Sequence, residues 1–169
     1  MVRAIDMDLH PLIDLLLLVL AANGAPLLAE RLLGPVADWP LDFNFRLPVD
    51  QRPLFGAHKT FRGIIASLAA TPLLALLLGL PALAGVEAAL FAMLGDLCSS
   101  FCKRRLGLHS GAMALGLDQI PESLFPALAL RTELGLRGWD IGIFVAVFIG
   151  LELVLSRILF HLNLRKQPH

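Results

Sequence analysis

Five apolar segments dominate this chain and restrict what it can fold into. A bilayer core is crossed by about 20 helical residues, and only helices and closed barrels satisfy every backbone polar group there. Of the 169 residues, 57% are hydrophobic, more than the 45–50% of soluble domains. We therefore expect an all-α polytopic membrane protein in which residues 1–169 form a single domain. The segments run from about Leu9 to Leu33, from Ile64 to Leu83, from Val86 to about Cys102, from about Gln119 onward, and from Ile141 to Leu162.

The five segments differ in how well they fit a membrane span. The first, second and fifth are long enough, whereas the third and fourth are marginal, as expected of helices that line a polar cavity. Asn23-Gly24 and Pro26 interrupt the first segment, and Pro72 is expected to kink the second. No cleavable signal peptide is evident, because the first segment lacks a basic region before it and a clear small-residue cleavage site. About five transmembrane helices are therefore expected.

Positive charges are unevenly distributed between the segments. With the N-terminus outside and the C-terminus inside, eleven of the 14 Lys and Arg residues lie on the inner side, as the positive-inside rule favours. This orientation in the cell (inner) membrane places two charged loops, residues 34–62 and 103–118, in the cytoplasm with the nucleoside triphosphates. The formal net charge is zero, so no overall field points to nucleic acid as a partner.

A polar sequence, Gly-Asp-Leu-Cys-Ser-Ser-Phe-Cys-Lys-Arg-Arg, closes the third segment. In a helix, Asp96, Ser99, Ser100 and Lys103 share one face, with Asp96 roughly 10 Å inside the basic end of the span. Charge at such depth usually has a function. Asp96 would be a hard metal ligand beside phosphate-binding cations. The alternative is that Asp96 is only the buried partner of a lysine or arginine. The basic triplet alone is most often a stop-transfer or headgroup cluster. The two cysteines of this sequence are expected to be packing residues.

The first cytoplasmic loop ends in Gly-Ala-His-Lys-Thr-Phe-Arg-Gly, directly before the second segment. Lys59 and Arg62 supply cations suited to phosphate, and His58 and Thr60 add hydrogen-bonding groups. Glycine lets the backbone approach a ligand closely, and a helix start presents free N–H groups to anions. The alternative is an ordinary positive anchor followed by a turn. The clustering between glycines favours a binding function.

Other polar residues have two interpretations each. Asp118 alone would be a helix N-cap, but together with Asp96 it could hold Mg²⁺, which prefers few carboxylates plus water and phosphates. Asn23 could recognise a nucleotide or a lipid headgroup, or it could bond another helix. Glu122 is a candidate to support the metal ligand, and Glu152 is expected to make a polar contact between helices rather than to act in catalysis. The serines lack an identifiable His/Asp partner, so a covalent nucleophile is not indicated.

The order of the motifs resembles that of the CDP-archaeol synthase family. These are CTP-dependent cytidylyltransferases of archaeal lipid synthesis, related to phosphatidate cytidylyltransferase. The resemblance covers residues 20–125 and implies a five-helix membrane enzyme that uses Mg²⁺ and CTP. It is carried by Asn-Gly-Ala-Pro in the first segment, Gly-Ala-His-Lys-Thr-Phe-Arg-Gly before the second, Gly-Asp-Leu-Cys-Ser-Ser-Phe-Cys-Lys-Arg-Arg-Leu-Gly closing the third, and Leu-Asp-Gln before the fourth.

Matching positions imply roles for individual residues. Asp96 and Asp118 would be the metal-site carboxylates and would act in catalysis with Lys59 and Lys103. Ser99 and Ser100 are also expected to bind the substrate, because they share a helix face with Asp96. The nucleotide and phosphate pocket would then comprise Asn23, His58, Lys59, Thr60, Arg62, Ser99, Ser100, Lys103, Arg104 and Arg105.

Two departures from the archaeal pattern concern the lipid substrate. Residues 108–115 lack the proline-bearing stretch expected after the basic triplet, and Glu122 stands one residue beyond the position where the archaeal form tends to have a second aspartate. The expected reaction is transfer of CMP from CTP to a membrane lipid phosphate, with pyrophosphate released. The lipid is either an archaeal-type ether-lipid phosphate or phosphatidic acid.

Two other classes of protein remain at this point. A CDP-alcohol phosphotransferase would carry the motif Asp-x-x-Asp-Gly-x-x-Ala-Arg, which this sequence lacks. A non-catalytic membrane partner or transporter subunit would use its polar residues only to hold helices together. Many transporters contain inverted repeats, which are not evident here. Mg²⁺-dependent retention of CTP would separate the synthase from a structural partner.

Overall fold

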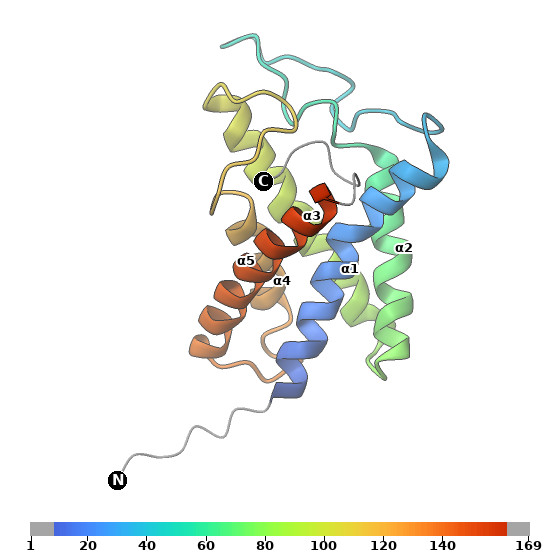
Figure 1. Ribbon diagram of the computed structural model, residues 1–169, viewed down its shortest axis with the longest axis vertical. Helices are drawn as coiled ribbons and strands as arrows, with labels where there is room; N and C mark the ends of the chain where they lie inside the picture. The colour runs from blue at the N-terminus through green and yellow to red at the C-terminus, as the bar shows by residue number, and fades with distance from the viewer. Residues whose placement is uncertain (1–8, 162–169) are drawn as a thin grey trace.

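The chain forms a bundle of helices joined by two long loops at one end (Figure 1). The structure, a computed structural model, describes residues 9–161, with the side chains of residues 9–158. Within that range it has no strand, only the isolated bridges Pro40–Thr60 and Arg46–Pro53. The all-α expectation is confirmed. The helices are α1 (Leu9–Leu33), α2 (Phe61–Leu77), α3 (Ala82–Arg105), α4 (Gln119–Ala129) and α5 (Gly138–His161).

Three of these helices, α1, α3 and α5, are long and apolar enough to cross a membrane. The expectation that the second segment is a full span and the third only marginal was wrong, since α2 has 17 residues and α3 has 24. The chain leaves α2 earlier than expected because Gly79 adopts a φ of +78° and the Leu80 N–H donates to the Ala75 carbonyl at 2.9 Å. This is a glycine-terminated helix end, and α3 begins directly after Pro81.

Pro26 does not interrupt α1, contrary to expectation. The helix is continuous through it, although a proline removes one N–H and leaves the carbonyl four residues earlier, that of Ala22, without its helical partner. Gly63 of α2 lies against the proline ring, because a Cβ built on Gly63 would be 3.2 Å from Pro26 Cβ. Packing of a neighbouring helix at the proline is a common way in which membrane helices tolerate it.

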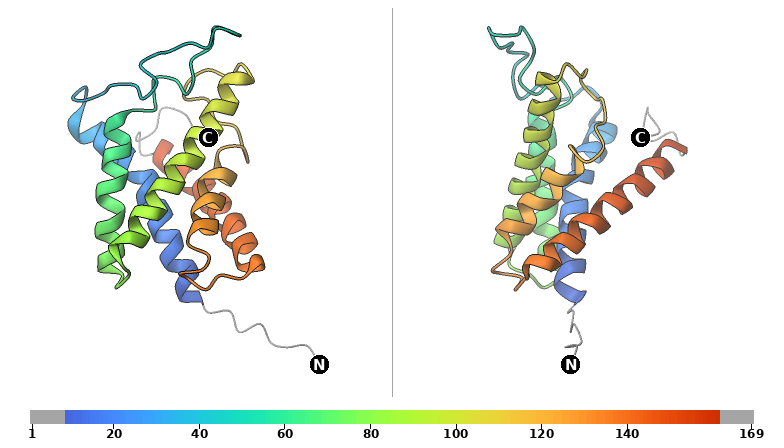
Figure 2. Two further views of the ribbon diagram at one scale, coloured as in Figure 1. Left: turned by 180° about the vertical axis from the view of Figure 1, so that it is seen from behind. Right: turned by 90° about the vertical axis from the view of Figure 1, so that its left-hand side faces the viewer.

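The two long loops, residues 34–60 and 106–118, lie at the same end of the bundle, as the charge distribution requires (Figures 1 and 2). The α2–α3 turn and residues 130–137 lie at the opposite end. In the right-hand view of Figure 2, α5 diverges from the other helices toward its C-terminal end. Arg3, Leu162, Arg165 and Lys166, which entered the span and orientation predictions, lie outside the described residues.

The outer surface of the bundle is apolar. Leu32 is 82% exposed and Leu77 is 84% exposed, and many other large apolar side chains also face outward, which suits contact with lipid rather than water. The interior holds leucines of α1, alanines of α2 to α4, and Phe144 and Phe148 of α5. These features are those of an integral membrane protein.

Glycines of α3 bring neighbouring helices into backbone contact. A Cβ on Gly85 would lie 2.5 Å from Pro72 Cα of α2, and a Cβ on Gly95 would collide with the Pro121 carbonyl group of α4. Small residues at helix interfaces permit such close approach in membranes. The contact at Gly95 sets Glu122 of α4 beside Asp96 of α3, and this juxtaposition builds the site described next.

Candidate active site

A cavity of about 440 Å³ opens among the helices near the loop end of the bundle. We call it the central cavity. Its wall is apolar in part, through Leu20, Leu27, Met93 and Phe148. Its polar lining gathers residues from all five helices and the first loop, namely Asn23, Glu30, Asp38, His58, Lys59, Thr60, Arg62, Asp96, Glu122, Glu152 and Ser156.

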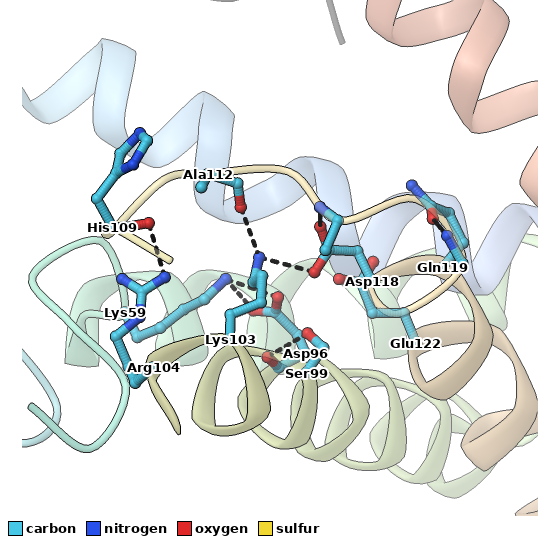
Figure 3. Close-up of polar contacts among 12 residues, drawn as sticks. Lys59, Asp96, Ser99, Lys103, Arg104, His109, Ala112, Asp118, Gln119 and Glu122 are labelled. Carbon is cyan, nitrogen blue, oxygen red and sulfur yellow. Dashed lines mark hydrogen bonds and ion pairs between the residues drawn. The ribbon is translucent and has the colours of Figure 1, made fainter. Parts of the chain in front are cut away.

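Lys59 and Asp96 form an ion pair in this cavity (Figure 3). Lys59 Nζ donates to Asp96 Oδ1 at 2.6 Å and to Oδ2 at 2.5 Å, and the two side chains are 25% and 19% exposed. Lys59 sits on the last loop residues before α2, where Thr60 caps the helix by accepting the Gly63 N–H at 3.2 Å. The cap fixes the direction from which the lysine reaches α3.

Lys59 is held in its charged form. Burial alone would lower the pKa of Lys59, but the charge and hydrogen bond of Asp96, followed by the charges of Glu122 and Asp118, raise it above its ordinary value of 10.5. An ammonium with such a pKa does not act as a proton acceptor at neutral pH. Lys59 therefore provides a fixed positive charge beside the carboxylates.

Glu122 joins α4 to this site from the other side. Asn23 Nδ2 of α1 donates to Glu122 Oε2 at 3.2 Å, so the amide and the carboxylate meet across the cavity. Glu122 is only 8% exposed. Asn23, Lys59, Asp96 and Glu122 thus come together from three helices and a loop, although they are far apart in the sequence.

Lys103 and Asp118 form a second pair that does not line the central cavity. Lys103 Nζ lies 2.7 Å from Asp118 Oδ1, poorly aligned for a hydrogen bond, and donates to the Ala112 carbonyl at 2.9 Å (Figure 3). Asp118 Oδ2 accepts the Ala114 N–H at 2.8 Å. Asp118 precedes α4 but makes no side-chain capping bond to it. In the structure, this pair orders the second loop against α3.

Arg62 and Arg105 bind the first loop through its backbone. Arg62 donates to the carbonyls of Gly34 at 2.5 Å and Val36 at 2.8 Å, and pairs with Asp38 at 2.9 Å. Arg105 pairs with Asp50 at 2.8 Å and donates to the Pro53 carbonyl at 2.5 Å. Their contact with a phosphate stays a prediction, and the protein contacts give both arginines a positioning role.

The remaining predicted binding residues differ in exposure. Ser99 and Ser100 are buried in α3, and Ser99 Oγ donates to the Asp96 carbonyl at 2.9 Å. Neither serine lines the central cavity. His58 is exposed on its rim. Arg104 is buried beside the second loop, where its Nη2 donates to the His109 carbonyl at 2.7 Å.

Sequence reasoning missed Asp42, which organises the first loop. Its carboxylate accepts the N–H groups of Asn44 at 3.0 Å, Phe55 at 2.9 Å and Gly56 at 3.0 Å, and the residue is 6% exposed. Burial alone would raise the pKa of Asp42, but these backbone hydrogen bonds lower it below its ordinary value. An Asx turn at Asp42-Phe43-Asn44 was the available signal. Asp42 positions the backbone that carries Lys59.

The carboxylates fit Mg²⁺ in the chemistry of their donors. Within residues 9–158, no group of three or more His, Cys, Asp or Glu side chains is spaced to hold a metal ion. Mg²⁺ is commonly bound by only one or two carboxylates, with water and substrate phosphates completing its shell. Asp96 and Asp118 supply such oxygens, and a bound ion would compete with Lys59 and Lys103 for them.

Comparison with known proteins gives a consistent result. The family model described as "CarS-like: CDP-archaeol synthase" matches residues 12–169. A CDP-archaeol synthase of Hyperthermus butylicus is 41% identical over 120 residues, covering 66% of this chain and 68% of that protein. A CDP-archaeol synthase of Sulfurisphaera tokodaii is 33% identical over 135 residues, covering 76% of this chain and 81% of that protein.

One solved structure is similar as well. It is described as "Structural insight into an intramembrane enzyme for archaeal membrane lipids biosynthesis". The two chains superpose with a TM-score of 0.68 at 34% sequence identity, over 85% of this chain and 91% of that one. The similarity therefore extends over most of both chains.

Proposed function

Because this chain belongs to the CDP-archaeol synthase family, we propose that it transfers CMP from CTP to an archaeal-type ether-lipid phosphate, giving a CDP-lipid and pyrophosphate. The observation that supports this most directly is the Lys59–Asp96 pair in a cavity that is polar at its loop end and partly apolar in its wall. Such a cavity suits a reaction between a charged nucleotide and the head of a membrane lipid.

In the proposed reaction, an oxygen of the lipid phosphate attacks the α-phosphorus of CTP. The new bond joins that oxygen to the α-phosphorus, and the bond from the α-phosphorus to the bridging oxygen of the β-phosphate breaks. The electron pair leaves with pyrophosphate. The attacking oxygen is already anionic, so the site needs no strong base. The main obstacle is the approach of two polyanions.

The cations of the chain address this obstacle. Lys59 would hold a phosphate group in the central cavity, with His58 on the rim and Asn23 opposite. Arg62 and Arg105 would keep the first loop in place, while Lys103 would hold the second loop through the Ala112 carbonyl. In phosphoryl transfer, catalysis is mainly positioning and stabilisation of developing charge, and fixed cations on rigid elements perform both tasks.

We propose Mg²⁺ as the cofactor, held through Asp96 and Asp118. When bound, the ion neutralises charge on the triphosphate and polarises the reacting phosphorus. Glu122, beside Asp96 and bonded to Asn23, supports the position of the metal-ligating carboxylate. The ammonium groups of Lys59 and Lys103, freed from these carboxylates, would then be available to phosphate oxygens.

The cavity wall also suggests where the lipid chains lie. Leu20 and Leu27 of α1 line the cavity together with Phe148 and Leu155 of α5, and α5 diverges from the bundle toward this end (Figure 2). An apolar gap between α1 and α5 would let the hydrocarbon chains remain in the membrane while the phosphate reaches Lys59. The loops would face the cytoplasm, with the N-terminus outside and the C-terminus inside.

The test of this function is a lipid panel. Purified protein in detergent receives CTP, Mg²⁺ and either an ether-linked archaeal-type lipid phosphate or phosphatidic acid, and the CDP-lipid is measured by mass spectrometry. We expect CDP-lipid with the ether lipid, and none without Mg²⁺. Product with phosphatidic acid alone would overturn the proposed substrate, and no product with any lipid from folded protein would contradict the function.

A further inference from the structure

A second cavity, of about 350 Å³, lies between the two loops. We call it the loop cavity. Arg46 and Arg52 of the first loop line one part, and Arg104, His109 and Ser110 line another. Ala57 lines both cavities, whereas Gly56 lines the loop cavity and not the central cavity. The loop cavity is therefore a neighbour of the candidate active site, with a lining of its own.

The lining of the loop cavity is strongly basic. It contains three guanidinium groups, and none of its lining residues in the described part of the chain is acidic. Two carboxylates of the surrounding loops are already paired, Asp50 with Arg105 and Asp118 with Lys103. A concave site with one sign of charge attracts an ion of the opposite sign.

Arg104 points to a specific kind of ligand. It is only 3% exposed, and its Nε and Nη1 have no hydrogen-bond partner among the residues that the structure describes. Arg104 Nη1 and Ser110 Oγ both lie close to Gly56. A Cβ built on Gly56 would be 3.2 Å from Arg104 Nη1 and 2.7 Å from Ser110 Oγ. Buried donors without acceptors are destabilising, and a guanidinium fork fits the oxygens of a phosphate group.

We infer that the loop cavity binds a phosphate-type oxyanion independently of the nucleotide in the central cavity. The inference rests on the proposed function in one respect, since the proposed reaction releases pyrophosphate next to this cavity. Pyrophosphate held there would leave the α-phosphate position of the central cavity unobstructed. An anionic lipid headgroup has the same phosphate chemistry, so the experiment includes both sources.

The experiment measures binding of radiolabelled pyrophosphate to the full chain in nanodiscs of neutral lipid. The protein is first saturated with α,β-methylene CTP, which occupies the nucleotide site without reacting. We expect about one pyrophosphate per chain to bind under these conditions. Arg104→Lys keeps a cation but loses the fork and should weaken this binding roughly tenfold, as loss of a charge-assisted hydrogen bond does. Arg46→Gln, on the exposed side of the cavity, should weaken it severalfold.

Arg137→Gln is the matched control, because it removes one exposed Arg charge at the opposite end of the bundle and should leave pyrophosphate binding unchanged. Complete displacement of pyrophosphate by the CTP analogue, or wild-type binding by both the Arg104 and Arg46 variants, would overturn the inference. Failure of the chain to bind the CTP analogue would contradict the proposed function. In that case, pyrophosphate binding measured without the analogue would still test the loop cavity.

The nanodisc lipid then distinguishes the two sources of the anion. Pyrophosphate binding that is equal in neutral and anionic nanodiscs supports a site for the soluble product. Binding that is lost only in anionic nanodiscs supports a headgroup as the natural occupant of the same oxyanion site. Both results require that Arg104→Lys weakens pyrophosphate binding in neutral nanodiscs, and an unchanged affinity there contradicts the site itself.

Discussion

Lys59 and Asp96 are joined by two short contacts, with the ammonium 2.6 Å from Oδ1 and 2.5 Å from Oδ2. Lys59 lies next to the last residue of the first loop and Asp96 lies within α3, so the pair ties the loop to the bundle in the candidate active site. In the proposed reaction the same two groups act on phosphate and Mg²⁺. The structural role of the pair and its proposed catalytic role can be separated by experiment.

Replacing one member of the pair should destabilise the protein. Lys59→Met leaves the Asp96 carboxylate without its partner and should lower the free energy of unfolding by about 1–3 kcal/mol, less than for a fully buried pair because both groups are partly exposed. The double variant Lys59→Met with Asp96→Asn should recover most of that loss, while turnover stays abolished in both variants. Denaturant unfolding in detergent measures the first effect and CDP-lipid formation the second. A double variant no more stable than Lys59→Met would contradict the pairing.

Gly95 should tolerate no side chain. A methyl group on Gly95 collides with the backbone of Pro121 and Glu122, so Gly95→Ala should lower the free energy of unfolding by about 1–3 kcal/mol through overpacking and should reduce turnover by moving Glu122. Gly142→Ala in α5 is the control, since a Cβ there meets nothing within 4 Å and alanine favours a helix by about 0.5–1 kcal/mol. Equal thermal stability of the two variants would argue against the close α3–α4 contact.

Gly111 links the two loops at the rim of the site. It has a φ of +82°, and a Cβ there would lie 3.1 Å from His58 Nε2. Gly111→Ala should therefore displace His58 and raise the KM for CTP. Gly135→Ala, at a φ of +65° with nothing within 4 Å, carries the same backbone strain of about 1–2 kcal/mol at the far end of the bundle. A KM that changes equally in both variants would show that backbone strain alone, and not contact with His58, is responsible.

The helical bundle and the grouping of polar residues were accessible from sequence because both follow from local pattern. Apolar runs separated by basic loops predict helices and a common loop end, and that arrangement brings the residues before α2 close to the end of α3. The assignment of Asp96 and Lys59 to one site came from the resemblance to the CDP-archaeol synthase family. The continuity of α1 through Pro26 could not be predicted, because it depends on how α2 packs against the proline ring.

The division of labour among the arginines was also not predictable. Arg62 and Arg105 occur in motifs that suggest phosphate binding, yet in the structure both contact loop carbonyls and carboxylates. A guanidinium has the same donors for a phosphate and for a backbone carbonyl, so only the fold decides which it meets. The role of Asp42 was hidden for a related reason, since two of its three N–H partners lie 13 and 14 residues further along the chain.

Asp42 gives the first loop a defined pH dependence. The folded pKa of Asp42 lies below its ordinary value of 3.8, so its charged form stabilises the folded loop above that value, and this contribution is lost as the pH falls through the folded pKa. Asp42→Asn should make the loop more sensitive to proteolysis at pH 7 by weakening its hydrogen bonds to backbone N–H groups. The difference in proteolysis rate between Asp42→Asn and wild type should become smaller below about pH 4. Asp140→Asn, at the other end of the bundle, should leave proteolysis of the first loop unchanged. A difference between Asp42→Asn and wild type that grows as the pH falls would contradict the role assigned to Asp42.

The most direct test of the account follows the phosphorus atoms of CTP. Purified wild type and Asp96→Asn are given the preferred lipid phosphate, Mg²⁺ and CTP labelled with ³²P at either the α or the γ position, and folding of both proteins is checked by their unfolding transitions. We predict that wild type moves the α label into lipid and the γ label into pyrophosphate, and that folded Asp96→Asn moves neither. Transfer of the γ label to lipid, or wild-type turnover by Asp96→Asn, would contradict cytidylyl transfer at this site.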